Sequence, residues 1–252
     1  MTQSHLAALV TGAARRVGRA LALRLAAEGF AVALHASARS RGEAEALASD
    51  IAAAGGRACV VAADLADAAA AGAIVPQAAA ALGSLALLVN NASLFRPDAA
   101  QDMGAASFDA HMAVNLRAPC LLAQAFAAQA VAGASIVNII DQRVWRLNPR
   151  YFSYTLSKSA LWTATRTLAQ ALAPQVRVNA IGPGPTLANE RQAAAAFARE
   201  AALAPLRRAV ALEDIADAMM YLARAGNVTG QMLAVDGGQH LAWQTPDVLA
   251  SE

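Results

Sequence analysis

The stretch that decides the fold runs from residue 7 to residue 18 and reads Ala7-Ala8-Leu9-Val10-Thr11-Gly12-Ala13-Ala14-Arg15-Arg16-Val17-Gly18. Its first four residues are apolar and predict a short buried strand, and a helix is expected from Arg16 onwards. A glycine-bearing turn between a strand and a helix lets backbone N–H groups and the helix N-terminus approach a pyrophosphate. Glycines also occur in many ordinary strand–helix turns, so the stretch indicates a fold and leaves the ligand open.

The same alternation of a short apolar run and a longer amphipathic or Ala-rich segment continues along the chain. Strands are expected at Ala7–Val10, Ala31–Leu34, Ala58–Ala62, Leu85–Val89, Ser135–Ile140, Arg177–Ala180 and Met232–Val235. Helices are expected at Arg16–Glu28, Gly42–Ala54, Asp67–Leu82, Ser107–Ala130, Phe152–Leu172, Asn189–Ala202 and Leu212–Ala223. Strands that are apolar on both faces and alternate with helices predict a parallel sheet covered on both sides.

No linker or shift in composition divides the chain. We therefore expect residues 1–252 to form a single α/β domain of the Rossmann type, a doubly wound parallel sheet of about seven strands with helices on both faces. In such a fold the ligand lies at the carboxyl ends of the strands, where the strand order reverses.

The composition excludes several classes of protein. Hydrophobic residues make up 57% of the chain and charged residues only 15%, but neither uncharged stretch, 68–95 or 118–140, is a run of about 20 strongly apolar residues. We expect no membrane span and no signal peptide. A net charge of +2 without a basic stripe argues against nucleic-acid binding. Cys59 and Cys120 form no disulfide or metal pattern, which favours a reduced, cytoplasmic protein with no metal site.

Two segments bear on which dinucleotide would bind. Arg16 stands, beside Arg15, where a third glycine is often found, and two guanidiniums at a phosphate-binding turn suggest an extra phosphate. After the second expected strand the sequence is Leu34-His35-Ala36-Ser37-Ala38-Arg39-Ser40-Arg41-Gly42, with no acid to accept a ribose 2′-hydroxyl. Hydroxyls and cations suit a 2′-phosphate, so we expect NADPH rather than NADH. The alternative is that His35, Arg39 and Arg41 form only a solvated loop.

A single lysine gives the clearest indication of chemistry. Of the 20 basic residues, 19 are arginine, and Lys158 is the only lysine in the chain. Tyr154 lies four residues earlier, one helical turn away on the same face. An ammonium there can hold a ribose hydroxyl while its charge lowers the pKa of the phenol, which would make Tyr154 a proton donor. A lone lysine on a solvated helix face is the alternative.

Together these motifs resemble the short-chain dehydrogenase/reductase family over nearly the whole chain. The motifs are the Thr11–Gly18 turn, Asp64-Leu65, Asn90-Asn91-Ala92-Ser93, Asn115, Tyr154-x-x-x-Lys158, Arg177-Val178-Asn179-Ala180 leading to Gly182-Pro183-Gly184, and Val235-Asp236-Gly237-Gly238. The resemblance implies that Asp64 and Leu65 border the adenine, Asn91 and Ala92 the ribose, and Pro183, Gly184 and Thr186 the nicotinamide and phosphates. It implies that Asn115 holds a water that links Lys158 to solvent. With these go, as cofactor-binding candidates, Gly12, Arg15, Arg16, Val17, Gly18, His35, Ser37, Arg39, Ser40, Ser93, Tyr154 and Lys158.

One position departs from most of the family. A serine usually stands 13 residues before the tyrosine, but here the residue is Asp141. A carboxylate opposes a developing oxyanion, whereas it suits ring N–H and amino donors or a proton relay to an imine nitrogen. Asp141 could instead pair with Arg143, Arg146 or Arg16 as a purely structural group.

This combination resembles the pteridine reductases and dihydromonapterin reductases within the family. The resemblance implies that Phe95 stacks on a pterin ring, although ordinary loop packing would also explain an aromatic residue there. The expected substrate pocket comprises Ser93, Phe95, Asp141, Trp145 and Leu187. The segments 96–107 and 186–199 are expected to set specificity.

The expected activity is NADPH-dependent reduction of a dihydropterin to a tetrahydropterin, with dihydrofolate as a further candidate substrate. Tyr154, Lys158, Asp141 and Asn115 would form the catalytic group. The alternatives are a carbonyl reductase that acts on a 3-oxoacyl thioester, a sugar or a small ketone, and a non-catalytic NADPH-binding regulator. The family resemblance also implies a homotetramer.

Overall fold

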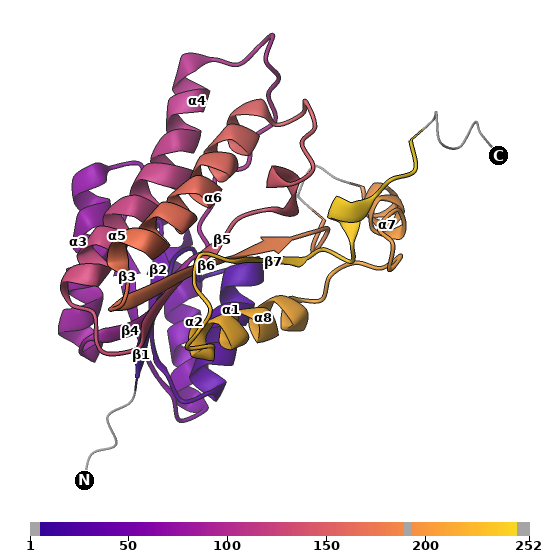
Figure 1. Ribbon diagram of the computed structural model, residues 1–252. Helices are drawn as coiled ribbons and strands as arrows, with labels where there is room; N and C mark the ends of the chain where they lie inside the picture. The colour runs from indigo at the N-terminus through magenta and orange to yellow at the C-terminus, as the bar shows by residue number, and fades with distance from the viewer. Residues whose placement is uncertain (1–5, 189–192, 246–252) are drawn as a thin grey trace.

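A parallel sheet of seven strands forms the centre of the molecule (Figure 1). The computed structural model describes residues 6–188 and 193–245. The strands are β1 (Ala7–Val10), β2 (Ala31–Ala36), β3 (Arg57–Ala62), β4 (Leu85–Asn90), β5 (Ala134–Ile139), β6 (Val176–Pro183) and β7 (Met232–Val235). Their order is β3-β2-β1-β4-β5-β6-β7, and every neighbouring pair is parallel. The order therefore reverses between β1 and β4, as predicted for a doubly wound sheet.

Helices cover both faces of the sheet (Figure 1). One face carries α1 (Arg16–Ala27), α2 (Arg41–Ala53) and α8 (Leu212–Arg224). The other carries α3 (Ala68–Leu82), α4 (Ala105–Met112), α5 (Ala118–Ala128) and α6 (Phe152–Leu172). The nine-residue helix α7 (Ala194–Ala202) lies beside the carboxyl ends of β6 and β7. None of the helices in the described part of the chain is long and apolar enough to cross a membrane.

The strand β1 shows how the core is built. Ala8 and Val10 pack into the cluster that faces α1 and α8, whereas Ala7 and Leu9 pack into the cluster on the opposite face. Successive side chains of a strand point to opposite faces of the sheet, so all four residues are buried. Such a strand has to be apolar throughout, which is why a short uninterrupted apolar run predicted it.

The fold and the strands agree with the sequence predictions, and most differences are confined to the ends of elements. The predicted bounds of β1, β7 and α6 are those observed. Of the helix predicted at Asn189–Ala202, residues 189–192 lie outside the described residues, and α7 begins at Ala194.

The prediction of one continuous helix over Ser107–Ala130 is wrong. The segment divides into α4, a π-helical turn η2 (Ala113–Arg117) and α5. Pro119 in the first turn of α5 has no N–H to donate to a carbonyl one turn earlier. A π-turn inserts an extra residue at such a break, and here it contains Asn115.

A chain of buried hydrogen bonds fixes α6 on the sheet. Asn90 Nδ2 at the end of β4 donates to Asn138 Oδ1 on β5 (2.8 Å), and Asn138 Nδ2 donates to Thr165 Oγ1 on α6 (2.9 Å). All three side chains are buried. Because a buried amide without partners is costly, this chain specifies how α6 sits against β4 and β5.

Replacement of Asn138 by alanine tests this chain. Asn138→Ala leaves the buried Asn90 Nδ2 without its acceptor. We therefore expect the free energy of unfolding to fall by about 2 kcal/mol or more. Urea unfolding followed by circular dichroism measures the change. Ser49→Ala, on the exposed side of α2, is the control and should change stability by less than about 0.5 kcal/mol. Equal losses in both variants would contradict the role of the chain.

Candidate active site

The turn after β1 is closed against the segment after β4. Thr11 Oγ1 accepts hydrogen bonds from the backbone N–H groups of Asn91 (2.9 Å) and Ala92 (3.0 Å). Gly12 has φ +62°, and a Cβ on Gly18 would lie 2.1 Å from the carbonyl oxygen of Gly12. Both positions therefore require glycine, and the first turn of α1 lies against the backbone of the turn.

His35 supports this turn from below. Its Nδ1 accepts a hydrogen bond from the Gly12 N–H (3.1 Å), and its Nε2 lies 3.2 Å from the Ala63 carbonyl oxygen, which it reaches as a donor in the neutral tautomer. The ring is buried, and burial lowers its pKa to about 4. His35 is one of the predicted cofactor contacts, and it lines a groove at the carboxyl ends of the strands. Both of its ring nitrogens, however, are bonded to backbone groups.

The residues that follow β2 form the rim. Ser37 precedes the short helix η1 (Ala38–Ser40), which contains Arg39 and Ser40, and the two serine hydroxyls are 3.2 Å apart. Arg39 is exposed and makes no ion pair with any described residue. Arg41, by contrast, pairs with Glu45 on α2 at 2.7 Å.

The two arginines of the turn point in different directions. Arg15 pairs with Glu43 on α2. Arg16 has φ +52°, a backbone conformation that favours glycine, and its guanidinium donates to the carbonyls of Leu187 (3.1 Å) and Ala188 (2.9 Å). Arg16 thus joins the start of α1 to the loop after β6.

These elements enclose a groove of about 900 Å³ along the carboxyl ends of the strands. Its size suits a nucleotide cofactor. The predicted cofactor residues that line it are Gly12, Arg15, Arg16, Val17, Gly18, His35, Ser37, Arg39, Ser40, Asp64, Leu65, Asn91, Ala92, Ser93, Tyr154, Lys158, Pro183 and Gly184. Thr186 lines an adjoining cavity instead.

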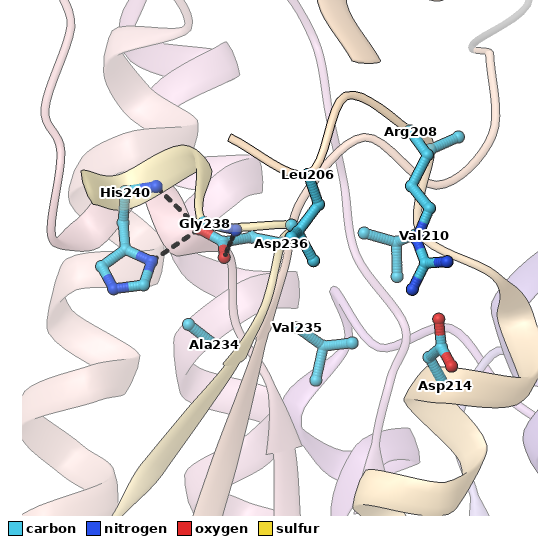
Figure 2. A pocket seen from close by; sticks show the side chains of 11 residues that line it. Leu206, Arg208, Val210, Asp214, Ala234, Val235, Asp236, Gly238 and His240 are labelled. Atoms are coloured by element: carbon cyan, nitrogen blue, oxygen red, sulfur yellow. Dashed lines mark hydrogen bonds and ion pairs between the residues drawn. The ribbon is translucent and has the colours of Figure 1, made fainter. Parts of the chain in front are cut away.

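The turn after β7 supports the far end of the groove. Asp236 accepts hydrogen bonds from the Gly238 N–H, the His240 N–H and the His240 ring (2.9, 2.8 and 2.7 Å; Figure 2). A Cβ on Gly184 would lie 2.7 Å from the Asp236 Cα. The loop after β6 can therefore pack on this turn only through glycine.

Asp141, Tyr154 and Lys158 meet in the groove between β5 and α6. The Tyr154 hydroxyl donates to Asp141 Oδ2 (2.9 Å), and Asp141 Oδ1 accepts the Arg143 N–H (2.8 Å) as the cap of the short helix η3 (Gln142–Val144). Lys158 Nζ donates to the Ile139 carbonyl (2.8 Å). The three side chains predicted to carry the chemistry thus form one cluster.

Burial shifts the protonation of this cluster. Desolvation raises the pKa of Asp141, and desolvation together with the Asp141 carboxylate raises the pKa of Tyr154 well above its ordinary value. Burial lowers the pKa of Lys158 to about 8. The prediction that Lys158 lowers the phenol pKa is wrong for this arrangement, because a carboxylate faces the hydroxyl and the ammonium binds a carbonyl.

Among the described residues, Asp141 forms no ion pair with an arginine, although the charge of Arg143 counteracts part of the rise in its pKa. The guanidiniums of Arg143, Arg146 and Arg16 all donate to neutral acceptors. Those acceptors are Asn148 Oδ1 and the carbonyls of Arg150, Gln239, Leu187 and Ala188.

Asn115, in the π-turn, fixes the floor of the groove. Its side chain accepts the Leu94 N–H (2.7 Å) and donates to the Leu94 carbonyl (2.9 Å) and to Ser157 Oγ (3.0 Å). Ser93 Oγ donates to the same Asn115 oxygen (3.3 Å). A water-holding role for Asn115 stays a prediction.

A second cavity, of about 530 Å³, adjoins the groove at Phe95 and Asp141. Phe95 stacks on Tyr151 with ring centroids 4.2 Å apart and an interplanar angle of 10°, and it meets the edge of Tyr154 at 4.7 Å. Leu187, a predicted substrate-pocket residue, lines this cavity. Trp145 lines neither cavity, and its ring instead contacts Trp162 and His240.

Several residues of the second cavity were not predicted. Tyr151 lies three residues before Tyr154, and this helical spacing of two aromatic residues was the available signal. Ala193, Ala196 and Phe197 lie in the segment 186–199, which is expected to set specificity. No sequence signal marks the others, which are Gln142, Arg143, Arg150, Pro185, Glu200 and Gln239.

A doubly wound sheet with a glycine turn at its first strand–helix junction, and a buried Tyr–Lys pair beside it, defines a dinucleotide-dependent oxidoreductase. Residues 12–240 match the family model described as "Enoyl-(Acyl carrier protein) reductase". The chain belongs to the short-chain dehydrogenase/reductase family, as its motifs predicted.

Individual relatives are named for different activities. The chain is 33% identical over 248 residues to the 3-oxoacyl-[acyl-carrier-protein] reductase FabG of Staphylococcus aureus, covering 96% of this chain and 99% of the relative. The crystal structure of FolM alternative dihydrofolate reductase 1 from Brucella canis, complexed with NADP, is 51% identical with a TM-score of 0.94, covering 97% and 98%. A blue fluorescent protein from a metagenomic library, in complex with NADPH, is 34% identical with a TM-score of 0.87, covering 95% and 99%.

The buried His35 predicts a pH-dependent stability. Its pKa is about 4 in the folded chain against an ordinary 6.5, so the unfolded chain takes up the proton first as the pH falls. The contribution of the neutral His35 ring to the free energy of unfolding is complete above about pH 6.5. About 3 kcal/mol of this contribution is lost as the pH falls to about 4.

Comparison of the wild type with His35→Gln isolates this contribution, since other groups titrate in both. The variant is less stable at pH 7, and we expect the difference in the free energy of unfolding to shrink by about 3 kcal/mol between pH 7 and pH 4. Urea unfolding at several pH values measures it. A difference that does not change with pH would contradict a neutral, buried His35.

Proposed function

We propose that this chain is an NADPH-dependent reductase of dihydropterins, with dihydrofolate among its substrates. The observation that carries the proposal is the carboxyl group of Asp141, 2.9 Å from the Tyr154 hydroxyl, where most of the family has a serine. The FolM structure, named as an alternative dihydrofolate reductase, supports it at 51% identity.

The groove suits NADPH. Gly12 and Gly18 leave room for backbone to approach a pyrophosphate at the start of α1. Ser37, Arg39 and Ser40 would bind the 2′-phosphate, and Lys158 would bind the nicotinamide ribose. The complexes of the neighbouring structures with NADP and NADPH support this assignment.

Reduction of a C=N bond needs a hydride at carbon and a proton at nitrogen. NADPH, when bound, supplies the hydride. In the pair formed by Tyr154 and Asp141, the phenol holds the proton: its hydroxyl donates to Asp141 Oδ2 (2.9 Å), and burial together with the Asp141 carboxylate raises the phenol pKa. After the proton passes to the ring nitrogen, the negative charge left on the pair is stabilised by the Arg143 N–H and the Lys158 ammonium.

The second candidate is reduction of a 3-oxoacyl thioester, favoured by the FabG relatives. Its substrate is a ketone, whose oxygen becomes negative during hydride transfer. A carboxylate beside that oxygen opposes the developing charge, so Asp141 favours the C=N substrate over the ketone.

We further propose that residues 1–252 act as one domain, in the cytoplasm and as a homotetramer, as the family resemblance implies. The Ala-rich faces of α5 and α6 would permit close approach between subunits. Sedimentation velocity on the purified protein tests the assembly.

The choice of NADPH over NADH is tested at the rim. Arg39→Ala removes the unpaired guanidinium, so we expect the ratio of kcat/KM for NADPH to that for NADH to fall by about ten-fold or more. Steady-state kinetics with both cofactors measures it. Arg41→Ala, whose guanidinium pairs with Glu45, is the matched control. If both variants keep the wild-type ratio, Arg39 does not bind the 2′-phosphate.

The choice of substrate is tested at Asp141. Asp141→Ser removes the carboxyl group and restores the usual family residue, so dihydropterin reduction should fall by about 100-fold or more, whereas any ketone reduction is kept or rises. Tyr154→Phe should abolish both. NADPH oxidation with dihydrobiopterin, dihydrofolate and acetoacetyl thioester measures them. Dihydropterin turnover that survives Asp141→Ser would overturn the proposal.

A further inference from the structure

The second cavity has three arginines in its wall. They are Arg16, Arg143 and Arg150, of which Arg16 is tied to the loop after β6. Two carboxylates, Asp141 and Glu200, also line the cavity. Asp141 is bound to Tyr154 and to the Arg143 N–H, and Glu200 lies on α7.

Arg143 is held in a fixed position. Its Nη1 donates to Asn148 Oδ1 (3.2 Å) and to the Arg150 carbonyl (3.1 Å), and its guanidinium lies 5.3 Å from the centre of the Tyr151 ring. The Nε is buried and has no hydrogen-bond partner. A guanidinium has five N–H donors, so a held Arg143 still has donors for a further acceptor.

Arg150 lies next to it on the same loop and is exposed. Its backbone is fixed at both ends, since its N–H donates to Asn148 Oδ1 (3.1 Å) and its carbonyl accepts from Arg143. No ion pair among residues 6–188 and 193–245 includes Arg143 or Arg150. Two arginines that line one cavity and form no ion pair with a described carboxylate favour a bound anion there.

The cavity therefore presents different chemistry at its two ends. Asp141 at the groove side suits N–H donors, the stacked rings of Phe95 and Tyr151 offer an aromatic surface, and Arg143 and Arg150 supply positive charge beyond them. A substrate that matches this order has a nitrogen-rich ring at one end and an anion at the other.

We propose that Arg143 and Arg150 form a subsite for the acidic tail of the substrate, so that the preferred dihydropterins carry a carboxylate or a phosphate on the side chain. This inference rests on the proposed function, because it assigns the second cavity to the same substrate. Guanidiniums bind carboxylates and phosphates alike, and the test separates the two sources.

The test compares substrates within one variant. Arg143→Gln/Arg150→Gln should lose at least about ten-fold more kcat/KM with dihydrofolate than with dihydrobiopterin, which has no acidic tail. Because Arg143 also lies beside Asp141, the ratio between substrates is the readout rather than either rate alone. Arg146→Gln is the matched control: it removes an arginine of the same loop that bonds to the Gln239 carbonyl and lines neither cavity.

A phosphate ester of dihydroneopterin, run beside dihydrofolate, identifies the anion. Loss confined to dihydrofolate assigns the subsite to carboxylates, and loss confined to the phosphate ester assigns it to phosphates. An unchanged ratio for both, or an equal change in Arg146→Gln, overturns the subsite.

A direct titration separates this inference from the proposed function. If the wild type reduces no dihydropterin, the proposed function fails. The affinity of the NADP⁺ complex for dihydrofolate, measured by calorimetry in wild type and double variant, then reports on the subsite alone. A Kd at least ten-fold weaker in the double variant supports it, and equal Kd values overturn it.

Discussion

Each central strand of this sheet is buried on both faces, so polar groups can leave the interior only where a strand ends. At the carboxyl ends, Asn90 closes β4, Asp141 follows β5, and the glycine turn follows β1. The hydrogen bonds from Asn90 through Asn138 to Thr165 then fix α6 across these ends. The position of Tyr154 and Lys158 depends on that constraint, since both lie on α6.

The cluster of Asp141, Tyr154 and Lys158 brings together three ionisable groups that water would ordinarily surround. Tyr154 and Lys158 are buried and Asp141 is half-buried. The resulting pKa shifts favour the neutral form of each group. Two backbone groups partly replace the lost water: the Arg143 N–H donates to Asp141, and the Ile139 carbonyl accepts from Lys158. Under the proposed function, these three groups would hold the proton and pass it to the substrate.

Much of the fold and the groove could be predicted because each depends on a local pattern. The short apolar run of β1, the glycines at 12 and 18, and the spacing of Tyr154 and Lys158 are all visible along the chain. Other features depend on contacts between distant segments. That His35 turns inward to Gly12 and Ala63, that Trp145 packs on His240, and that Tyr151 stacks on Phe95 follows from tertiary packing. The division of the helix near Pro119 had a local signal, but the Ala-rich periodicity on both sides concealed it.

The π-turn at Ala113–Arg117 sets the relative rotation of the helices on either side of it. Each residue of an α-helix turns the chain by about 100°, so loss of the extra residue would let an uninterrupted helix form and would swing α4 about its axis relative to α5. The apolar face of α4 would then leave α6, and the Asn115 amide would leave Leu94. Single-residue insertions and deletions in this turn are therefore expected to be more damaging than substitution of its exposed residue Arg117.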